Sequence, residues 1–124
     1  MATSNVALNE TTTCISADKV NGTDVYSTAG EKIGHVEDVM LNKRTGNVAY
    51  AIMAFGGFLG IGERYHPLPW SVLKYDTAKE GYVVPLDKSR LENAPSYSEQ
   101  ELGADDRRWR EPVSTYYNVP PYWM

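Results

Sequence analysis

The longest uncharged stretch of the chain, residues 47–62, predicts a strand that is buried on both of its faces. Residues 48–55 are all apolar, and successive side chains of a strand point to opposite faces. The turn formers Thr45, Gly46 and Asn47 precede this run. A membrane-spanning helix needs about 20 apolar residues, so the run is too short and too rich in glycine to span a bilayer. We expect one face to fill the protein interior and the other to be covered by the C-terminal tail or by a second subunit.

The segment before this strand, residues 32–41, predicts a strand with an irregularity. Its apolar positions change parity, with Val36 on the even side and Val39 and Leu41 on the odd side. A β-bulge near Glu37-Asp38 would produce this change by re-aiming the strand. Because bulges bend a strand, the sheet is expected to curve on itself.

Tight turns divide the remaining β-structure into short strands. Asn21-Gly22 and Ala29-Gly30 are turn signals, so residues 14–43 are expected to form short strands separated by turns. A further hairpin is predicted over residues 75–82. Pro67 and Pro69 interrupt the segment between these hairpins, and proline is confined to edges and ends of strands, so this segment is predicted to border an opening in the sheet.

Helices are predicted mainly after the strands. Residues 69–73 have proline at the start of one helical turn, with Trp70 facing inward. Asp87 is placed to cap a helix over residues 88–94. Ser98 and Glu101 have the spacing of a capping box, which predicts a helix from Glu99 to Trp109. An aromatic tail follows it, and large aromatic groups are costly to leave in water, so the tail is expected to dock on a protein surface.

Composition narrows the classes of function. A net charge of −4 and a pI near 5.1 argue against nucleic acid as a partner. Three arginines near Trp109 could touch RNA, but three neighbouring acidic residues balance them, so a solvated helix with Trp109 packed on the barrel is favoured. The single cysteine, Cys14, excludes an internal disulfide. The N-terminal residues 1–14 lack a secretion signal and read as a flexible arm, which favours a cytoplasmic protein.

The chain resembles PRC-barrel domains. The resemblance rests on four pieces in order, Gly30-Glu31-Lys32-Ile33-Gly34-His35-Val36-Glu37-Asp38-Val39, Thr45-Gly46-Asn47-Val48-Ala49-Tyr50, Gly56-Gly57-Phe58-Leu59-Gly60-Ile61-Gly62-Glu63 and Pro67-Leu68-Pro69-Trp70. It implies an all-β fold, a small and partly open barrel of about six strands over residues 15–95. A short helix then follows the barrel, and residues 96–124 form a C-terminal extension with a helix and an aromatic tail.

The settings in which this family is known imply a role without catalysis. Similar barrels form the cytoplasmic domain of the photosynthetic reaction centre H subunit and part of a ribosome-maturation factor. We therefore expect a non-catalytic adaptor that works by protein association, with a homodimer favoured. The alternatives are an accessory protein that binds a small ligand or tunes electron and proton transfer, and an accessory to ribosome assembly or RNA processing.

Patterns for other chemistry are incomplete. The glycine loop after residue 55 lacks the lysine of a phosphate-binding loop and the third glycine of a dinucleotide-binding loop. His35 and Glu37 match part of a zinc motif, but the cysteines that would complete it are missing, so an outward polar pair is favoured. No nucleophile stands in a recognisable catalytic pattern. We expect no enzyme activity, no metal and no cofactor.

Two sets of candidate residues follow. The first set could contact a protein partner and consists of Phe55, Phe58, Leu59, Ile61, Trp109, Tyr116, Tyr117, Tyr122 and Trp123. The second could border the barrel mouth and bind a ligand or carry protons, and consists of Tyr65, His66 and Trp70. His66 is the candidate for titration near neutral pH.

Overall fold

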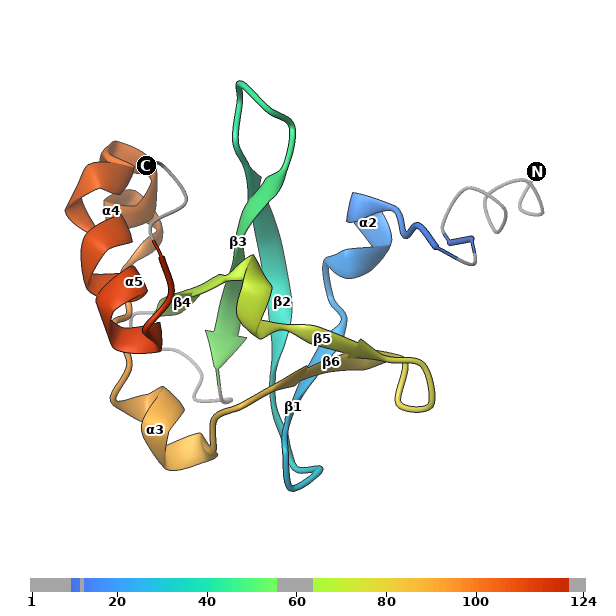
Figure 1. The fold of residues 1–124 in the computed structure, drawn as a ribbon. Helices are drawn as coiled ribbons and strands as arrows, with labels where there is room; N and C mark the ends of the chain where they lie inside the picture. Colours follow the sequence, from blue (N-terminus) through green and yellow to red (C-terminus); the bar gives the residue numbers. More distant parts are fainter. Residues whose placement is uncertain (1–9, 12, 56–63, 121–124) are drawn as a thin grey trace.

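The computed structural model describes residues 10–11, 13–55 and 64–120, and it contains one mixed sheet of six strands that does not close on itself. The strands occur in the sheet in the order β4-β3-β2-β1-β6-β5 (Figure 1). Their bounds are β1 Asp24–Ser27, β2 Lys32–Leu41, β3 Val48–Phe55, β4 Tyr65–Pro69, β5 Lys74–Asp76 and β6 Gly81–Val84. All neighbours are antiparallel except β1 and β6. The predicted partly open barrel of about six strands is confirmed.

The long hairpin of β2 and β3 forms the middle of the sheet and extends beyond the other strands at its turn (Figure 1). Its register shifts between Val36 and Asp38, which confirms the predicted bulge. A second shift lies between Met40 and Leu41. Gly34 is needed near the other end, because a Cβ there would stand 2.4 Å from the carbonyl oxygen of Ala54.

Strand β4 lies at one edge of the sheet, as its two prolines predict. The 3-10 turn η1, Trp70–Val72, follows it directly and begins after Pro69, where a helical turn was predicted. Strands β5 and β6 form the predicted hairpin. The edge position of β4 leaves it paired with β3 on one side, with a single bridge from Tyr65 to Tyr97 on the other.

The prediction of a strand ahead of the Asn21-Gly22 turn is wrong. Residues Ala17–Val20 form a short helix, α2, instead. Ser16 caps this helix by accepting a hydrogen bond from the backbone N–H of Lys19. The local capping interaction and the burial of Val20 therefore outweigh the hairpin signal of the turn that follows.

The C-terminal helices differ from the prediction in one respect. Helix α3, Lys88–Glu92, is capped by Asp87 as expected, and the capping box of Ser98 and Glu101 begins α4, Glu99–Ala104. The predicted single helix to Trp109 is wrong, because Asp105 is extended and caps the 3-10 turn η2, Asp106–Arg108. Aspartate competes for backbone N–H groups and favours such cap positions over helix interiors. Helix α5, Arg110–Tyr117, then contains part of the predicted tail.

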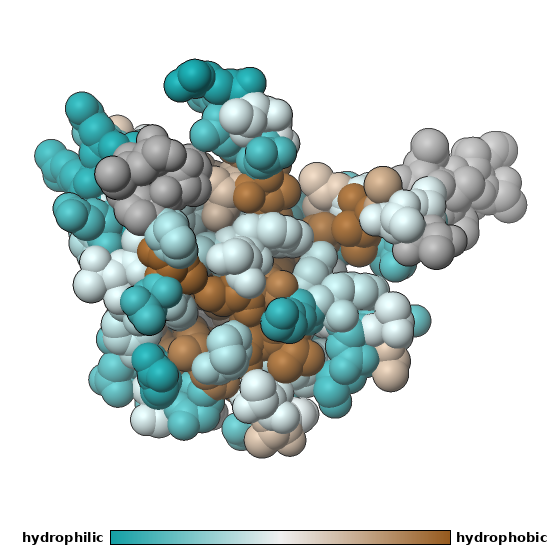
Figure 2. Space-filling view, viewed as in Figure 1, coloured by the Kyte–Doolittle hydropathy of each residue, from teal (hydrophilic) through white to brown (hydrophobic). Residues whose placement is uncertain are grey.

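Two hydrophobic clusters lie on opposite faces of β3. Ala51 and Met53 belong to the larger one, which the sheet and α3 enclose, and Tyr50 and Ile52 belong to the smaller one. This alternation confirms that β3 is buried on both faces. Figure 2 shows apolar side chains gathered between the C-terminal helices and the β5–β6 hairpin, within a polar rim. Among the described residues, no helix has the length and apolar character needed to cross a bilayer.

Candidate functional site

The second face of β3 is covered by the C-terminal part of the same chain. Trp109 is 1% exposed and packs edge-on against Tyr50, with 5.0 Å between the ring centroids. Its indole N–H donates to the carbonyl oxygen of Leu102, at 3.2 Å. Val113 of α5 completes the cluster and is fully buried. Trp109 is therefore a core residue of the folded chain, and a partner surface must be sought elsewhere.

Two tyrosines of the predicted partner set also contact their own chain. The hydroxyl of Tyr116 donates to the carbonyl oxygen of Arg90, at 2.6 Å, and the Arg90 guanidinium lies over the Tyr116 ring. Tyr117 packs against both clusters, and burial raises the pKa of its hydroxyl. Helix α5 thus docks on α3 and the sheet.

The rest of that set gives no further information on a partner. Phe55 ends β3, and Phe58, Leu59, Ile61, Tyr122 and Trp123 lie outside the described residues.

The three residues predicted to border a barrel mouth do not share one cavity. Tyr65 packs against the smaller cluster and lines a groove next to α4. His66 pairs with Met53 in the sheet and is 4% exposed. Trp70 packs against Tyr82, with ring centroids 5.5 Å apart, and lines a different hollow of about 220 Å³. The geometry separates these side chains, and so gives no support to a common ligand site.

His66 is held neutral by its surroundings. Burial is the largest cause, and the charge of Arg64 adds to it, so the pKa of His66 falls from 6.5 to about 4 although a hydrogen bond with the backbone of Pro95 opposes the shift. A histidine with this pKa does not change its charge near pH 7. It contributes to packing in the neutral form.

We expect His66 to make the stability of the protein depend on pH in mildly acidic solution. The unfolded state takes up a proton near pH 6.5 and the folded state only near pH 4, so the free energy of unfolding should fall as pH drops through this window. The expected loss attributable to His66 is about 3 kcal/mol. Urea unfolding at several pH values measures it. The variant His66→Gln should show a flatter profile, and parallel profiles for wild type and His66→Gln would refute the assignment.

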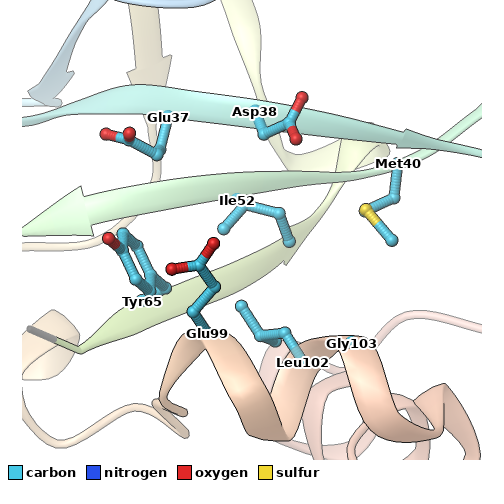
Figure 3. A pocket seen from close by; sticks show the side chains of 8 residues that line it. All are labelled: Glu37, Asp38, Met40, Ile52, Tyr65, Glu99, Leu102 and Gly103. Atoms are coloured by element: carbon cyan, nitrogen blue, oxygen red, sulfur yellow. The ribbon is translucent and has the colours of Figure 1, made fainter.

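The described residues form an open groove between β2, the neighbouring strands and α4. It has a volume of about 350 Å³ and is lined by Glu37, Asp38, Met40, Ile52, Tyr65, Glu99, Leu102 and Gly103. Glu99 and Leu102 project from α4 toward Ile52 of β3 (Figure 3). The floor is apolar, the walls carry three carboxylates, and none of the lining residues is basic.

The bulge in β2 explains why two successive carboxylates line this groove. In a regular strand Glu37 and Asp38 would point to opposite faces, but here Asp38 stands opposite Ile52 and Glu37 is the extra residue of the register shift between Val36 and Asp38. Glu37 also lies 3.1 Å from the imidazole Nε2 of His35, which is the outward polar pair expected from the sequence. The parity change in the sequence signals the bulge, but not the wall that α4 adds.

Met40 and Leu41 stand out beside the groove. They are the large hydrophobic residues exposed among the described ones, at 38% and 54%. Neither was predicted as a contact residue, because in sequence they only continue an apolar strand. Their exposure at the end of β2 is visible only once β3 and α4 are in place.

Other candidate chemistry has an intrachain explanation. Arg107 pairs with Asp105 at 3.0 Å and Arg110 lies 3.8 Å from Asp106, so the arginines near Trp109 are balanced as the sequence suggests. Within the ranges that the structure describes, no three His, Cys, Asp or Glu side chains gather as metal ligands would. Cys14 is exposed and has no disulfide partner.

Comparison with known proteins identifies the family of this chain. No match to a curated protein was found. The family model of the PRC-barrel domain matches residues 14–91, which is more than half of the chain and spans all six strands and most of α3. With this match and an open six-stranded sheet, the chain belongs to the PRC-barrel family.

Proposed function

We propose that this protein is a non-catalytic adaptor that acts by associating with protein, and with a second copy of itself in the first instance. PRC-barrel domains are generally non-catalytic. The single observation that carries the proposal is the exposure of Met40 and Leu41 next to an apolar groove. Exposed apolar side chains that adjoin a concave surface are typical of association sites.

The surface that supports self-association differs from the surface expected from the sequence. The two-sided strand β3 does not need a second subunit, because Trp109 and Val113 cover its second face. What needs cover is the end of β2 with Met40 and Leu41. The proposed contact surface is therefore the outer end of the β2–β3 hairpin, which projects from the sheet (Figure 1).

Light scattering after gel filtration, over a wide range of concentrations, tests this proposal. The wild-type protein should have the mass of a dimer at high concentration. Leu41→Ser should shift it to the mass of a monomer that still unfolds cooperatively, because the side chain is 54% exposed. Asn47→Ser, an exposed polar change in the same hairpin, is the matched control and should stay dimeric. A wild-type monomer at every concentration, or a dimer that Leu41→Ser leaves intact, would contradict the proposal.

A further inference from the structure

The groove beside α4 continues along the hairpin into a second hollow. This hollow has a volume of about 640 Å³ and shares Met40, Leu102 and Gly103 with the first. Five successive residues of β2 and the turn that follows it line this hollow, from Met40 to Arg44. The two hollows form one channel, which we call the hairpin groove, between the β2–β3 hairpin on one side and α4 with η2 on the other.

Irregular register brings successive residues of β2 into the hairpin groove. One shift lies at Glu37 and the other between Met40 and Leu41. Because each shift offsets the alternation of side chains, acidic and apolar residues that would face different sides of a regular strand line the same groove, and the basic residues follow in the turn after β2. Along the chain they occur in the order acidic pair, apolar pair, basic pair.

The order of these pairs is symmetric. Glu37-Asp38 and Lys43-Arg44 are centred at equal distances in sequence, about three residues, on either side of Met40-Leu41. A two-fold axis through the middle of this segment would therefore place the acidic pair of one copy opposite the basic pair of the other. Interfaces of this kind are self-complementary, since residue i contacts residue j and residue j contacts residue i.

Most charges of the groove lack a counter-charge in their own chain. Within the described part of the molecule, Asp38, Glu99, Lys43 and Arg44 take part in no ion pair. By contrast, Asp105 in the same groove is already bound to Arg107. The free charges are thus of opposite sign at the two ends of the groove, with exposed apolar side chains between them.

We propose that the hairpin groove binds the hairpin of a second copy of this chain, with the two-fold axis at Met40 and Leu41, so that Lys43 and Arg44 of each copy meet the partner's Glu37 and Asp38. The inference rests on the proposed function and specifies the surface and the register of the association. Glu99 on α4 adds a third carboxylate to the acidic end. The Met40 and Leu41 side chains of both copies pack together at the axis.

The apolar centre and the charged ends contribute differently to this dimer. Exposed ion pairs contribute little each, so burial of Met40 and Leu41 supplies most of the affinity. The charges fix the register, because a shift along the hairpin separates the opposite charges. Reversal of one pair should therefore oppose association in both halves of a symmetric dimer at once.

A charge-exchange experiment tests the inference on the full chain. The first variant carries Glu37→Lys and Asp38→Lys, and the second carries Lys43→Glu and Arg44→Glu. Each variant alone should dimerise at least about tenfold more weakly than the wild type. An equimolar mixture should form a heterodimer with near wild-type affinity, because every acidic end then meets a basic end. Light scattering and native mass spectrometry measure the two results.

The control exchanges charges outside the groove, with Glu92→Lys on α3 and Lys74→Glu on β5, both exposed. It should leave the dimer unchanged, and thermal unfolding of all variants checks that each is folded. Two variants that stay dimeric on their own, or a mixture that stays monomeric, would overturn the inference. If Leu41→Ser dissociates the dimer while both charge reversals do not, the proposed function stands and the charge register fails. A wild-type protein that stays monomeric would overturn both the proposed function and the charge register, and would indicate that a different protein binds the hairpin groove.

Discussion

Replacement of Trp109 by alanine should lower the free energy of unfolding by about 4 kcal/mol. Trp109 is buried against Tyr50, and its indole N–H is bonded to the carbonyl oxygen of Leu102. The substitution removes a large apolar side chain and leaves a cavity between α5 and β3. It also frees the last turn of α4, because the hydrogen bond from Trp109 to Leu102 is lost.

Urea unfolding followed by circular dichroism measures this loss. Trp109→Phe should cost less, about 1 to 2 kcal/mol, because it keeps an aromatic ring but not the hydrogen bond to Leu102. Arg108→Ala, an exposed neighbour, is the control and should change the free energy of unfolding by no more than about 0.5 kcal/mol. A loss below about 1 kcal/mol for Trp109→Ala would show that the C-terminal helices do not cover β3 in solution.

Local features of the fold were predictable because each depends on residues close in sequence. The parity change at Glu37-Asp38 signals the bulge, since the side-chain period of a strand is two. Ser98 and Glu101 satisfy each other's backbone N–H groups in the capping box. Pro67 and Pro69 exclude a central position for β4. In each case the determining interaction spans only a few residues.

The sequence predicts that both faces of β3 are covered, but not which segment covers the second face. An apolar pattern on both faces of residues 48–55 shows that something must pack there, but a second subunit and the C-terminal tail satisfy it equally well. Packing of Trp109 on the barrel was favoured from the balanced charges around it, but nothing local marks Trp109 as the residue that covers β3. Its position depends on the break at Asp105, which turns the chain from α4 into α5.

The hairpin groove could not be predicted for a related reason. Its acidic wall comes from a bulge in β2 and from Glu99 of α4, which are far apart in sequence and meet only in the folded chain. The exposure of Leu41 likewise depends on where β3 ends and where α4 lies. Sequence periodicity predicts which residues share one face of a strand or helix, whereas a groove is formed by several strands and helices together.

The largest effect is expected from removal of the C-terminal helices. A chain that ends at Tyr97 retains all six strands, α3 and every residue matched by the family model. It loses Trp109 and Val113, whose burial is worth about 1.5 to 3 kcal/mol each, and it exposes the Tyr50 and Ile52 face of β3. The sum is comparable to the whole stability of a small domain, which starts at about 5 kcal/mol. We therefore expect the shortened chain to lose its cooperative fold.

The C-terminal helices form part of the core of this PRC-barrel protein, because they cover the second face of β3. Thermal unfolding of the chain that ends at Tyr97, with binding of a hydrophobic dye recorded on the same sample, tests this role of the helices. We expect dye binding at 25 °C and no cooperative transition for the shortened chain, in contrast to a sharp transition and no dye binding for the full chain. A shortened chain that unfolds cooperatively at the same midpoint as the full chain, and binds no dye, would contradict it.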